Sequence, residues 1–333
     1  MEKFDILKKI VKECSEKLGI TEYELYYSES SGIRAETFRD EISAFSSSVG
    51  GDLLYRCIVN GKLGYASTQY LDESEMEKLV ARAAENASVI EKDEEAIIYG
   101  GAAPEAYRKV PECKFTMPSA AFIRERAMKN RNLLYAADGQ IADGTVSGAS
   151  AGQSRTFLFN SNGLDLSSFT GSEGEFFRVV LDNGEEKQTG GEYLPNGFEK
   201  ADDERVEKIE KAITEARAKF GAGTVKTGKY NIVFKNDQME AILSTFLSAF
   251  FADNVQKGLS QLADAEGTVI ASDIVTLVDD PFHKDNPMPI NFDAEGSPTH
   301  KKNVIENGKL CTLLYNLKTA AVAGKKTTGN ASK

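Results

Sequence analysis

The sequence predicts an α+β fold in which antiparallel sheets are covered by helices. Short runs of alternating polar and apolar residues, the pattern of half-buried strands, follow one another along the chain. Amphipathic helical patterns flank these runs, which is typical of helices laid on one face of a sheet. Asn-Gly pairs, whose residues tolerate the positive φ of a two-residue hairpin, join such runs at Asn60-Gly61, Asn162-Gly163 and Asn307-Gly308.

The first unit is predicted to be an N-terminal α+β domain over residues 1–113. Apolar residues recur at helical spacing over residues 3–18, and Gly19 follows as a C-cap. A second helix opens at Asp72, with acidic residues in its first turn, and extends to about residue 89. Between the helices, strand-like runs cover residues 24–27, 33–39, 42–48, 53–59 and 63–67.

The second unit is predicted to be a central α+β domain over residues 114–222. It follows a charged break at residues 91–95 and a linker-like stretch that contains Pro104 and Pro111. The acidic start of its last helix, DDERVEKI, matches DESEMEKL at Asp72, which we interpret as one local solution used twice. The expected elements are a helix at 119–134, strands at 141–150, 155–160 and 164–181, and a helix at 202–220.

The third unit is predicted to be the start of a C-terminal domain, left incomplete, over residues 223–333. Residues 239–251 are apolar almost all round, so that this helix is expected to lie at the centre of a core or an interface. The chain ends with residues 327–333 (TTGNASK) and no closing element, which predicts an unfinished core. The other expected elements are a strand at 229–234, a buried strand at 271–278, a proline-rich loop to Pro298 and a hairpin at 304–310.

Composition excludes several classes of function. The chain has 333 residues, with 40 Lys and Arg against 51 Asp and Glu, a net charge of −11 that disfavours nucleic acid and anionic membranes as partners. It shows no apolar run long enough to cross a bilayer and no signal-peptide core, which predicts a cytoplasmic protein. With two histidines it cannot build a histidine-rich metal site. No CxxC pair occurs, and mostly buried, reduced thiols are expected at Cys14, Cys57, Cys113 and Cys311.

Three local patterns suggest chemistry, and each has a plainer interpretation. Residues 223–230 fall one residue short of a phosphate-binding P-loop, because Tyr230 stands where Ser or Thr would bind Mg²⁺. Ser150 stands in Gly148-Ala-Ser-Ala-Gly152, the spelling of a nucleophile elbow with His283 or His300 as base, but small residues also suit a hairpin turn. A loop that offers possible metal ligands, without the usual zinc spacing, contains Asp279, Asp280, His283, Asp285, Asp293, Glu295 and His300.

Several stretches together resemble the TldD/PmbA family of peptide-maturation proteases, which are also called modulators of DNA gyrase. The similarity extends from end to end of the chain. Residues 255–260 (VQKGLS) and the TGNA ending place it nearest to the PmbA (TldE) branch. The stretches are residues 55–68 (YRCIVNGKLGYAST), 225–234 (VKTGKYNIVF), 271–281 (ASDIVTLVDDP), 292–299 (FDAEGSPT) and 328–331 (TGNA).

The resemblance implies a multi-unit α+β fold and a cytosolic dimer, in which TldD pairs with PmbA and the pair cleaves unfolded peptides in a closed cavity. In the TldD branch, an HExxxH motif on the helix after the third unit's first strand binds zinc. The corresponding positions here hold Leu243, Ser244 and Ser248. The resemblance therefore implies no catalytic residue, metal ligand or cofactor in this chain, and zinc in a TldD-like partner. The family's C-terminal portion, which holds a further ligand in TldD, would lie beyond Lys333.

Our leading hypothesis is a PmbA-like, metal-free subunit of a metallopeptidase heterodimer that acts on unfolded or extended peptides. Two alternatives stay open. One is a stand-alone hydrolase that uses Ser150 with His283, or a metal in the acidic loop. The other is a non-catalytic regulatory binding module of the gyrase-modulator type, for which a net charge of −11 disfavours direct DNA contact.

Overall fold

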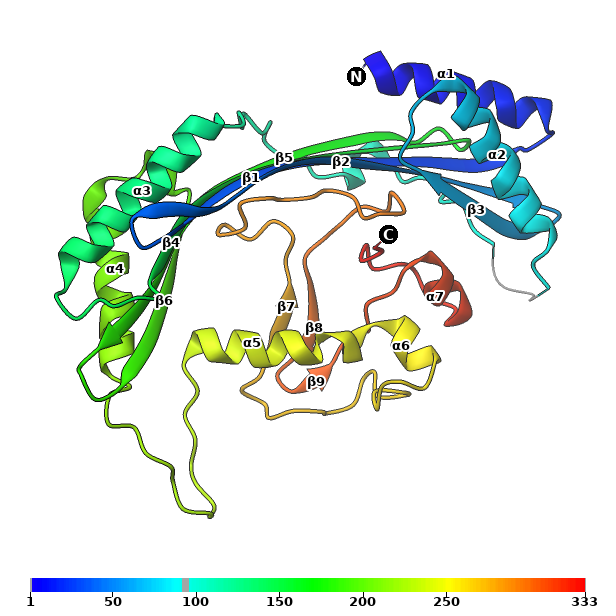
Figure 1. Ribbon diagram of the computed structural model, residues 1–333. Helices are drawn as coiled ribbons and strands as arrows, with labels where there is room; N and C mark the ends of the chain where they lie inside the picture. The colour runs from blue at the N-terminus through cyan, green and yellow to red at the C-terminus, as the bar shows by residue number, and fades with distance from the viewer. Residues whose placement is uncertain (1, 92–95, 333) are drawn as a thin grey trace.

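A long, arched antiparallel sheet dominates the computed structural model, which describes residues 2–91 and 96–332. Four helices cover the convex face of the arch, and a smaller lobe formed by the C-terminal third of the chain fills its concave side (Figure 1). The predicted α+β class, with antiparallel sheets under covering helices, is confirmed. None of the helices in the described ranges is both long and apolar enough to cross a membrane.

The sheet has six strands in the order β3-β2-β1-β4-β5-β6, and every neighbouring pair is antiparallel. The central pair, β1 with β4, joins strands from the first two predicted domains in one sheet. The boundaries predicted at residues 113 and 222 stay predictions. The strands are β1 (Glu22–Phe38), β2 (Glu41–Val59), β3 (Lys62–Thr68), β4 (Val146–Asn160), β5 (Asp165–Asp182) and β6 (Lys187–Pro195).

The strands are longer than the sequence predicts. The separate runs expected at 24–27 and 33–39 form one strand, and so do those at 42–48 and 53–59. Likewise, the predicted turn at residues 148–152 is wrong, because these residues lie within β4 and pair with both β1 and β5. The small residues that suggested breaks lie opposite one another across neighbouring strands, so the ladder overrides their weak strand propensity.

The sheet consists of two similar halves, each a three-stranded meander between two helices. Helices α1 (Glu2–Lys17) and α2 (Glu73–Ser88) flank β1–β3, whereas α3 (Ala120–Ala137) and α4 (Asp202–Arg217) flank β4–β6. A Cβ atom added at Gly64 in β3 would lie 2.0 Å from the Ala83 carbonyl oxygen of α2, and one at Gly190 in β6 would lie 2.0 Å from the Ala212 carbonyl oxygen of α4. The two matching helix starts in the sequence therefore belong to a repeated arrangement.

The helix predictions for these halves are confirmed, and one strand was missed. The Asp72 carboxylate accepts a hydrogen bond from the Glu75 backbone N–H, so it caps α2 as the sequence indicates. Strand β6 was not predicted, because Gly190 and Gly191 interrupt its alternation. Part of the predicted charged break at 91–95 lies outside the described residues.

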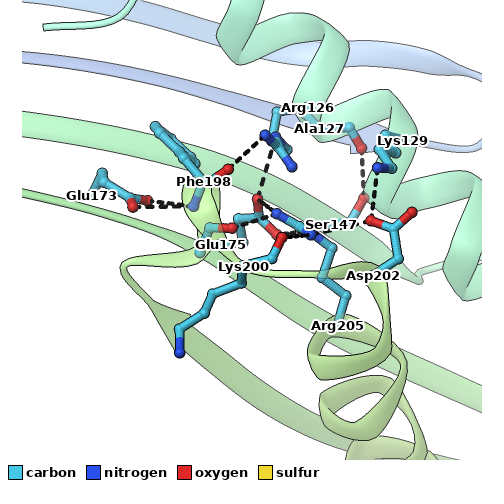
Figure 2. A network of polar contacts seen from close by, with 11 residues as sticks. Arg126, Ala127, Lys129, Ser147, Glu173, Glu175, Phe198, Lys200, Asp202 and Arg205 are labelled. Atoms are coloured by element: carbon cyan, nitrogen blue, oxygen red, sulfur yellow. Dashed lines mark hydrogen bonds and ion pairs between the residues drawn. The ribbon is translucent and has the colours of Figure 1, made fainter.

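A buried ionic network fixes the second half of the sheet (Figure 2). The Arg205 guanidinium on α4, which is fully buried, donates to both carboxylate oxygens of Glu175 on β5 at 2.7 and 3.0 Å. It also donates to the backbone carbonyls of Gly197 and Lys200 in the connection between β6 and α4. Arg126 on α3 lies 3.5 Å from the same carboxylate, so one buried acid holds two helices and a loop to the sheet.

The C-terminal lobe has its own small core, and much of its apolar surface is exposed. The strand expected at residues 229–234 is wrong: these residues form no strand, and Val233 is 95% exposed. Of the buried strand expected at 271–278, only its end forms a strand, and Ile274 is 88% exposed. The lobe comprises α5 (Asn236–Phe246), α6 (Ala252–Gln256), α7 (Leu317–Val322), β7 (Leu277–Asp279), β8 (Lys302–Glu306) and β9 (Lys309–Leu310).

Helix α5 forms as predicted, but its predicted place in a core is wrong within the described residues. No residue of α5 is buried. Side chains such as Leu243 and Phe246 are exposed to solvent. The physical reason is that the lobe's core gathers around β8, β9 and α7 instead. The expectation of an interface at this helix stays a prediction.

Candidate functional site

A cavity of about 480 Å³ lies between the concave face of the sheet and the C-terminal lobe. Four hydroxyl side chains line its sheet side as two cross-strand pairs, Ser154 opposite Thr170 and Thr156 opposite Ser168, on β4 and β5. Tyr26 of β1 lies beside them. Because side chains alternate between the faces of a strand, residues two apart share the concave face and form this platform.

A hydrogen-bonded carboxylate, amine and amide line the lobe side of the cavity. The Lys302 amine donates to an Asp279 carboxylate oxygen at 2.7 Å, and the Asn330 amide donates to the same oxygen at 2.7 Å. The Asn330 side-chain oxygen is buried, and no partner in the described chain satisfies it. Buried polar atoms normally find a partner, so this oxygen marks a place where a ligand donor or a water fits.

A tight loop at residues 292–299 completes the wall. The Asp293 carboxylate accepts hydrogen bonds from the backbone N–H groups of Glu295 and Ser297, each at 2.9 Å, and of Ala331 at 3.0 Å. The Ala294 N–H donates to the Ala331 carbonyl at 3.1 Å. Two of the stretches that carry the family resemblance, 292–299 and 328–331, are therefore bound to each other at the cavity, and Asp279 of a third stretch faces them.

An acid–base–acid contact joins the lobe to the sheet beside the cavity. Arg56 of β2 lies opposite Glu24 of β1, with Nη2 to Oε1 at 2.9 Å, and its Nη1 lies 3.6 Å from Glu295 of the lobe. Glu295 also accepts a hydrogen bond from the Leu317 N–H at the start of α7 at 2.9 Å. Burial raises the pKa of the Glu295 carboxyl, and the Leu317 N–H and Arg56 oppose this only partly.

The raised pKa of Glu295 predicts a pH-dependent contribution to stability. A carboxyl whose pKa is higher in the folded than in the unfolded protein favours folding below its unfolded pKa, and this contribution is lost as the pH rises through its folded pKa. Thermal unfolding of the wild type and Glu295→Gln between pH 4 and 8 measures it. Relative to this variant, the wild type should lose stability as the pH rises. A parallel pair of curves would contradict the assignment.

The positions predicted to correspond to the TldD-branch zinc motif do not line the cavity of about 480 Å³. Leu243 and Ser244 are on α5, and Ser248 is in the 3₁₀ turn that follows it. A second hollow, of about 500 Å³, is lined largely by apolar side chains that include Leu243, Leu247 and Leu277. Leucine cannot bind zinc and serine is not among its usual protein ligands, so these residues do not fit the metal.

No catalytic pair forms from the residues considered for a stand-alone hydrolase. Ser150 lies inside β4, opposite Arg34 and Gly174, and no helix follows it as an elbow requires. The Nδ1 atom of His283 accepts a hydrogen bond from the Asp285 N–H in an exposed turn. His300 lines a different cavity, beside α7. The three side chains are thus not brought together in the structure.

The acidic loop does not assemble a metal centre in the described part of the chain. No three side chains from His, Cys, Asp and Glu converge there on one point. Asp279 is paired with Lys302, Asp280 with Lys301, and Asp285 with His283. Asp279 and Asp280 thus each face a lysine, Asp285 lies 3.6 Å from the Nδ1 atom of His283, and the Asp293 carboxylate accepts backbone hydrogen bonds.

The remaining candidates from the sequence are the P-loop-like residues 223–230 and the four cysteines. No helix follows residues 223–230 directly, because residues 231–235 are irregular and α5 begins only at Asn236. The Tyr230 hydroxyl donates to the Lys226 carbonyl, so a phosphate cradle is absent at these described residues. All four cysteines are free: Cys14 and Cys57 are buried, whereas Cys311 is exposed, contrary to the expectation of mostly buried thiols. Burial raises the pKa of the Cys57 thiol to about 11, which makes it unreactive.

An arched, duplicated sheet that holds a small α+β lobe in its concavity defines a class of proteins with known members. The fold of this chain matches that of a Thermotoga maritima protein described as a candidate modulator of a DNA gyrase, with a TM-score of 0.85. The two sequences are 24% identical, and the match covers 98% of this chain and 74% of the Thermotoga maritima chain. The fold also matches TldE from Thermococcus kodakarensis, with a TM-score of 0.81 and 23% identity over 97% of this chain and 72% of that one. These similarities show the fold.

Sequence comparison identifies the family. The model of PmbA/TldA metallopeptidase domain 1 matches residues 23–87, and that of the PmbA/TldA metallopeptidase C-terminal domain matches residues 227–333. An uncharacterized protein of Methanocaldococcus jannaschii is 28% identical over 334 residues, which cover 98% of this chain and 74% of that protein. The chain belongs to the PmbA/TldD metallopeptidase family.

The hydroxyl platform is the part of the site that sequence reasoning missed. Thr156, Ser168 and Thr170 lie in predicted strands, whereas Ser154 falls in the gap between the strands predicted at 141–150 and 155–160, so the pairing of β4 with β5 in this register was not foreseen. The available signal was the spacing of two between hydroxyl residues on each strand. On the lobe side, Asp279 was among the sequence candidates, and Lys302 and Asn330 were not.

Proposed function

We propose that this chain is a PmbA-like (TldE-like) subunit of a TldD/PmbA metallopeptidase complex in the cytoplasm and binds no zinc itself. The proposal is supported by the residues on and after α5, where Leu243, Ser244 and Ser248 stand at the positions that the family resemblance aligns with HExxxH. Without imidazole ligands, nothing there lowers the pKa of a bound water, so the hydrolytic step belongs to a TldD-like partner.

The cavity under the arch supplies this subunit's part, which is to hold an unfolded or extended peptide for maturation or degradation. Hydroxyls donate and accept hydrogen bonds, and so does a side-chain amide, which suits the alternating N–H and C=O groups of an extended backbone. Phe292 and Ile290 line the same cavity and offer apolar contact for peptide side chains. A cavity of about 480 Å³ lies within the usual size of ligand pockets.

Partner dependence tests the proposal. Casein or a fluorogenic peptide should be cleaved when this chain is mixed with a TldD-like subunit that carries HExxxH, and elemental analysis of this chain alone should find no stoichiometric zinc. A partner whose HExxxH glutamate is replaced by glutamine is the control. One tightly bound zinc per chain would overturn the proposal, as would cleavage by the chain alone that Ser150→Ala abolishes.

Removing the hydroxyl platform should weaken peptide cleavage by the complex. Thr156→Val and Thr170→Val together delete one hydroxyl from each cross-strand pair at nearly constant volume. At about 1 kcal/mol for each lost hydrogen bond, the pair of changes predicts a loss of about tenfold or more in kcat/KM. Ser67→Ala, at an exposed position of β3, is the control and should leave cleavage unchanged. Equal activity of all three proteins would place the peptide elsewhere.

A further inference from the structure

Strand β2 has a free edge over much of its length. Strand β3 pairs only with residues 53–59 of β2, whereas residues 41–52 pair with β1 on one side and, within the described chain, with no backbone on the other. Val49 is 81% exposed, and most neighbouring side chains are exposed as well. A free edge presents a row of backbone donors and acceptors that another strand can join.

Nothing in the composition of this edge blocks pairing. Residues 42–51, ISAFSSSVGG, contain no charged residue and no proline. Native proteins normally protect a long edge with Lys, Pro or a bulge. Here the β1–β2 register shifts where Glu36 pairs with Ala44 and Thr37 pairs with Ile42, so Ser43 is a bulged residue at one end of the run. From residue 44 to residue 51 the edge carries none of these protections, which points to an edge that is covered when the protein is assembled.

The equivalent stretch in the second half of the sheet is residues 165–173 of β5. Strand β6 pairs with residues 174–182 of β5, so residues 165–172 pair with β4 alone, as residues 41–52 of β2 pair with β1 alone. There, the Phe115 side chain packs over Gly171, where an added Cβ would meet the ring at 2.2 Å. Tyr99 and Tyr107 of the same linker pack against the cluster that includes Leu166 of β5. These contacts are made on a face of the sheet, and Phe115 packs against the same core cluster as Ile42 and Phe45 of β2. The two edges differ in composition, because residues 165–173 include Asp165 and Glu173 whereas residues 42–51 include no charged residue.

The charges at the ends of the open edge select its partner. Glu41 precedes the uncharged run and Asp52 follows it. If two copies of this chain paired symmetrically over residues 42–51, antiparallel register would place Glu41 of each copy opposite Asp52 of the other. Like charges directly opposite each other across a ladder are destabilising, and the net charge of −11 adds repulsion between copies. A strand with Lys or Arg at both ends fits instead.

We propose that residues 42–51 of β2 are the docking edge for a partner subunit, which adds an antiparallel strand flanked by basic residues. If the partner subunit has the same arched fold, strand pairing at this edge joins the two sheets into one. The partner is the TldD-like subunit, and in this respect the inference rests on the proposed function.

A charge-reversal cycle on this chain alone tests the edge. Glu41→Lys and Asp52→Lys, each made singly, place a lysine opposite an acid at both ends of the symmetric pairing. Each should strengthen self-association in sedimentation equilibrium by about tenfold, through two like-charge contacts turned into attractive ones. The double variant places lysine opposite lysine and should associate as weakly as the wild type. Glu85→Lys, which changes the net charge equally at an exposed position of α2, is the control.

Equal association of all five proteins would overturn the docking edge. So would stronger association of the single variants without slower hydrogen exchange of backbone amides within residues 42–51, because a new ladder must protect the amides that point outward. If the wild-type chain already forms a dimer in which these amides are protected, the claim that Glu41 and Asp52 disfavour self-pairing would be overturned.

Hydrogen exchange in the presence of a purified TldD-like subunit separates the two proposals. Amides within 42–51 should slow at least tenfold on mixing, while those of exposed residues 226–234 serve as an internal reference. A complex that cleaves peptide but leaves the 42–51 amides fast would overturn the docking edge and leave the proposed function standing. If neither complex nor cleavage is found, the proposed function fails, and the charge-reversal cycle still decides whether the edge accepts a strand.

Discussion

Replacing Arg205 with alanine is expected to lower the free energy of unfolding by about 3–5 kcal/mol, as is usual when one partner of a buried ion pair is removed. Arg205 and Glu175 are both fully buried. The guanidinium donates two hydrogen bonds to the Glu175 carboxylate and one to each of two backbone carbonyls in the connection between β6 and α4. The variant leaves the Glu175 carboxylate in the protein interior with Arg126 as its remaining cation, at 3.5 Å.

Chemical denaturation with a matched surface variant measures this effect. Lys208→Ala removes another α4 cation, which pairs with Glu192 of β6 at 2.7 Å in a partly exposed position, and should cost about 1 kcal/mol or less. The variant Arg205→Met with Glu175→Leu should recover much of the loss, because it removes the unpaired charge and keeps apolar volume. A loss for Arg205→Ala no larger than for Lys208→Ala would mean that water reaches Glu175.

The sequence predicted local elements well and their assembly poorly, for physical reasons that particular residues show. Helix α2 was predicted with its cap, because Asp72 and the apolar spacing after it act within a few residues. The continuity of β1 could not be predicted, since Ser28 to Gly32 has weak strand propensity and is held by ladders on both sides, to residues distant in the chain. Tertiary pairing thus decided what local pattern left open.

In the candidate site, too, local stretches could be predicted from the sequence and their assembly could not. The stretches 292–299 and 328–331 stood out in the sequence, and the structure shows why they occur together: the Asp293 carboxylate binds the Ala331 N–H. The hydroxyl platform depends on the register of β4 against β5, which places Ser154 opposite Thr170. A shift of one residue would turn these hydroxyls to the convex face, so no local reading of the sequence could place them.

Gly64→Ala and Gly190→Ala are expected to be the most destabilising single-methyl additions in the arch, at about 3 kcal/mol each, the upper part of the range for overpacking. The added Cβ would overlap a helix backbone in both cases: at Gly64 it meets the Ala83 oxygen at 2.0 Å and the Ala87 nitrogen at 2.6 Å, and at Gly190 the Ala212 oxygen at 2.0 Å. Backbone atoms cannot rotate away, so the covering helix must move off the sheet.

Two other strand glycines provide the control for backbone entropy. Gly32→Ala and Gly152→Ala add the same methyl group where the nearest atoms lie at 3.6 Å, an ordinary contact distance. These variants should be neutral or slightly stabilising, because alanine restricts the unfolded chain more than glycine does. Urea denaturation of the four variants gives the comparison. Similar losses in the free energy of unfolding at Gly64 and Gly190 would show that α2 and α4 are packed equally closely on the sheet. A large loss at only one position would mean that the helix over the other position is free to shift.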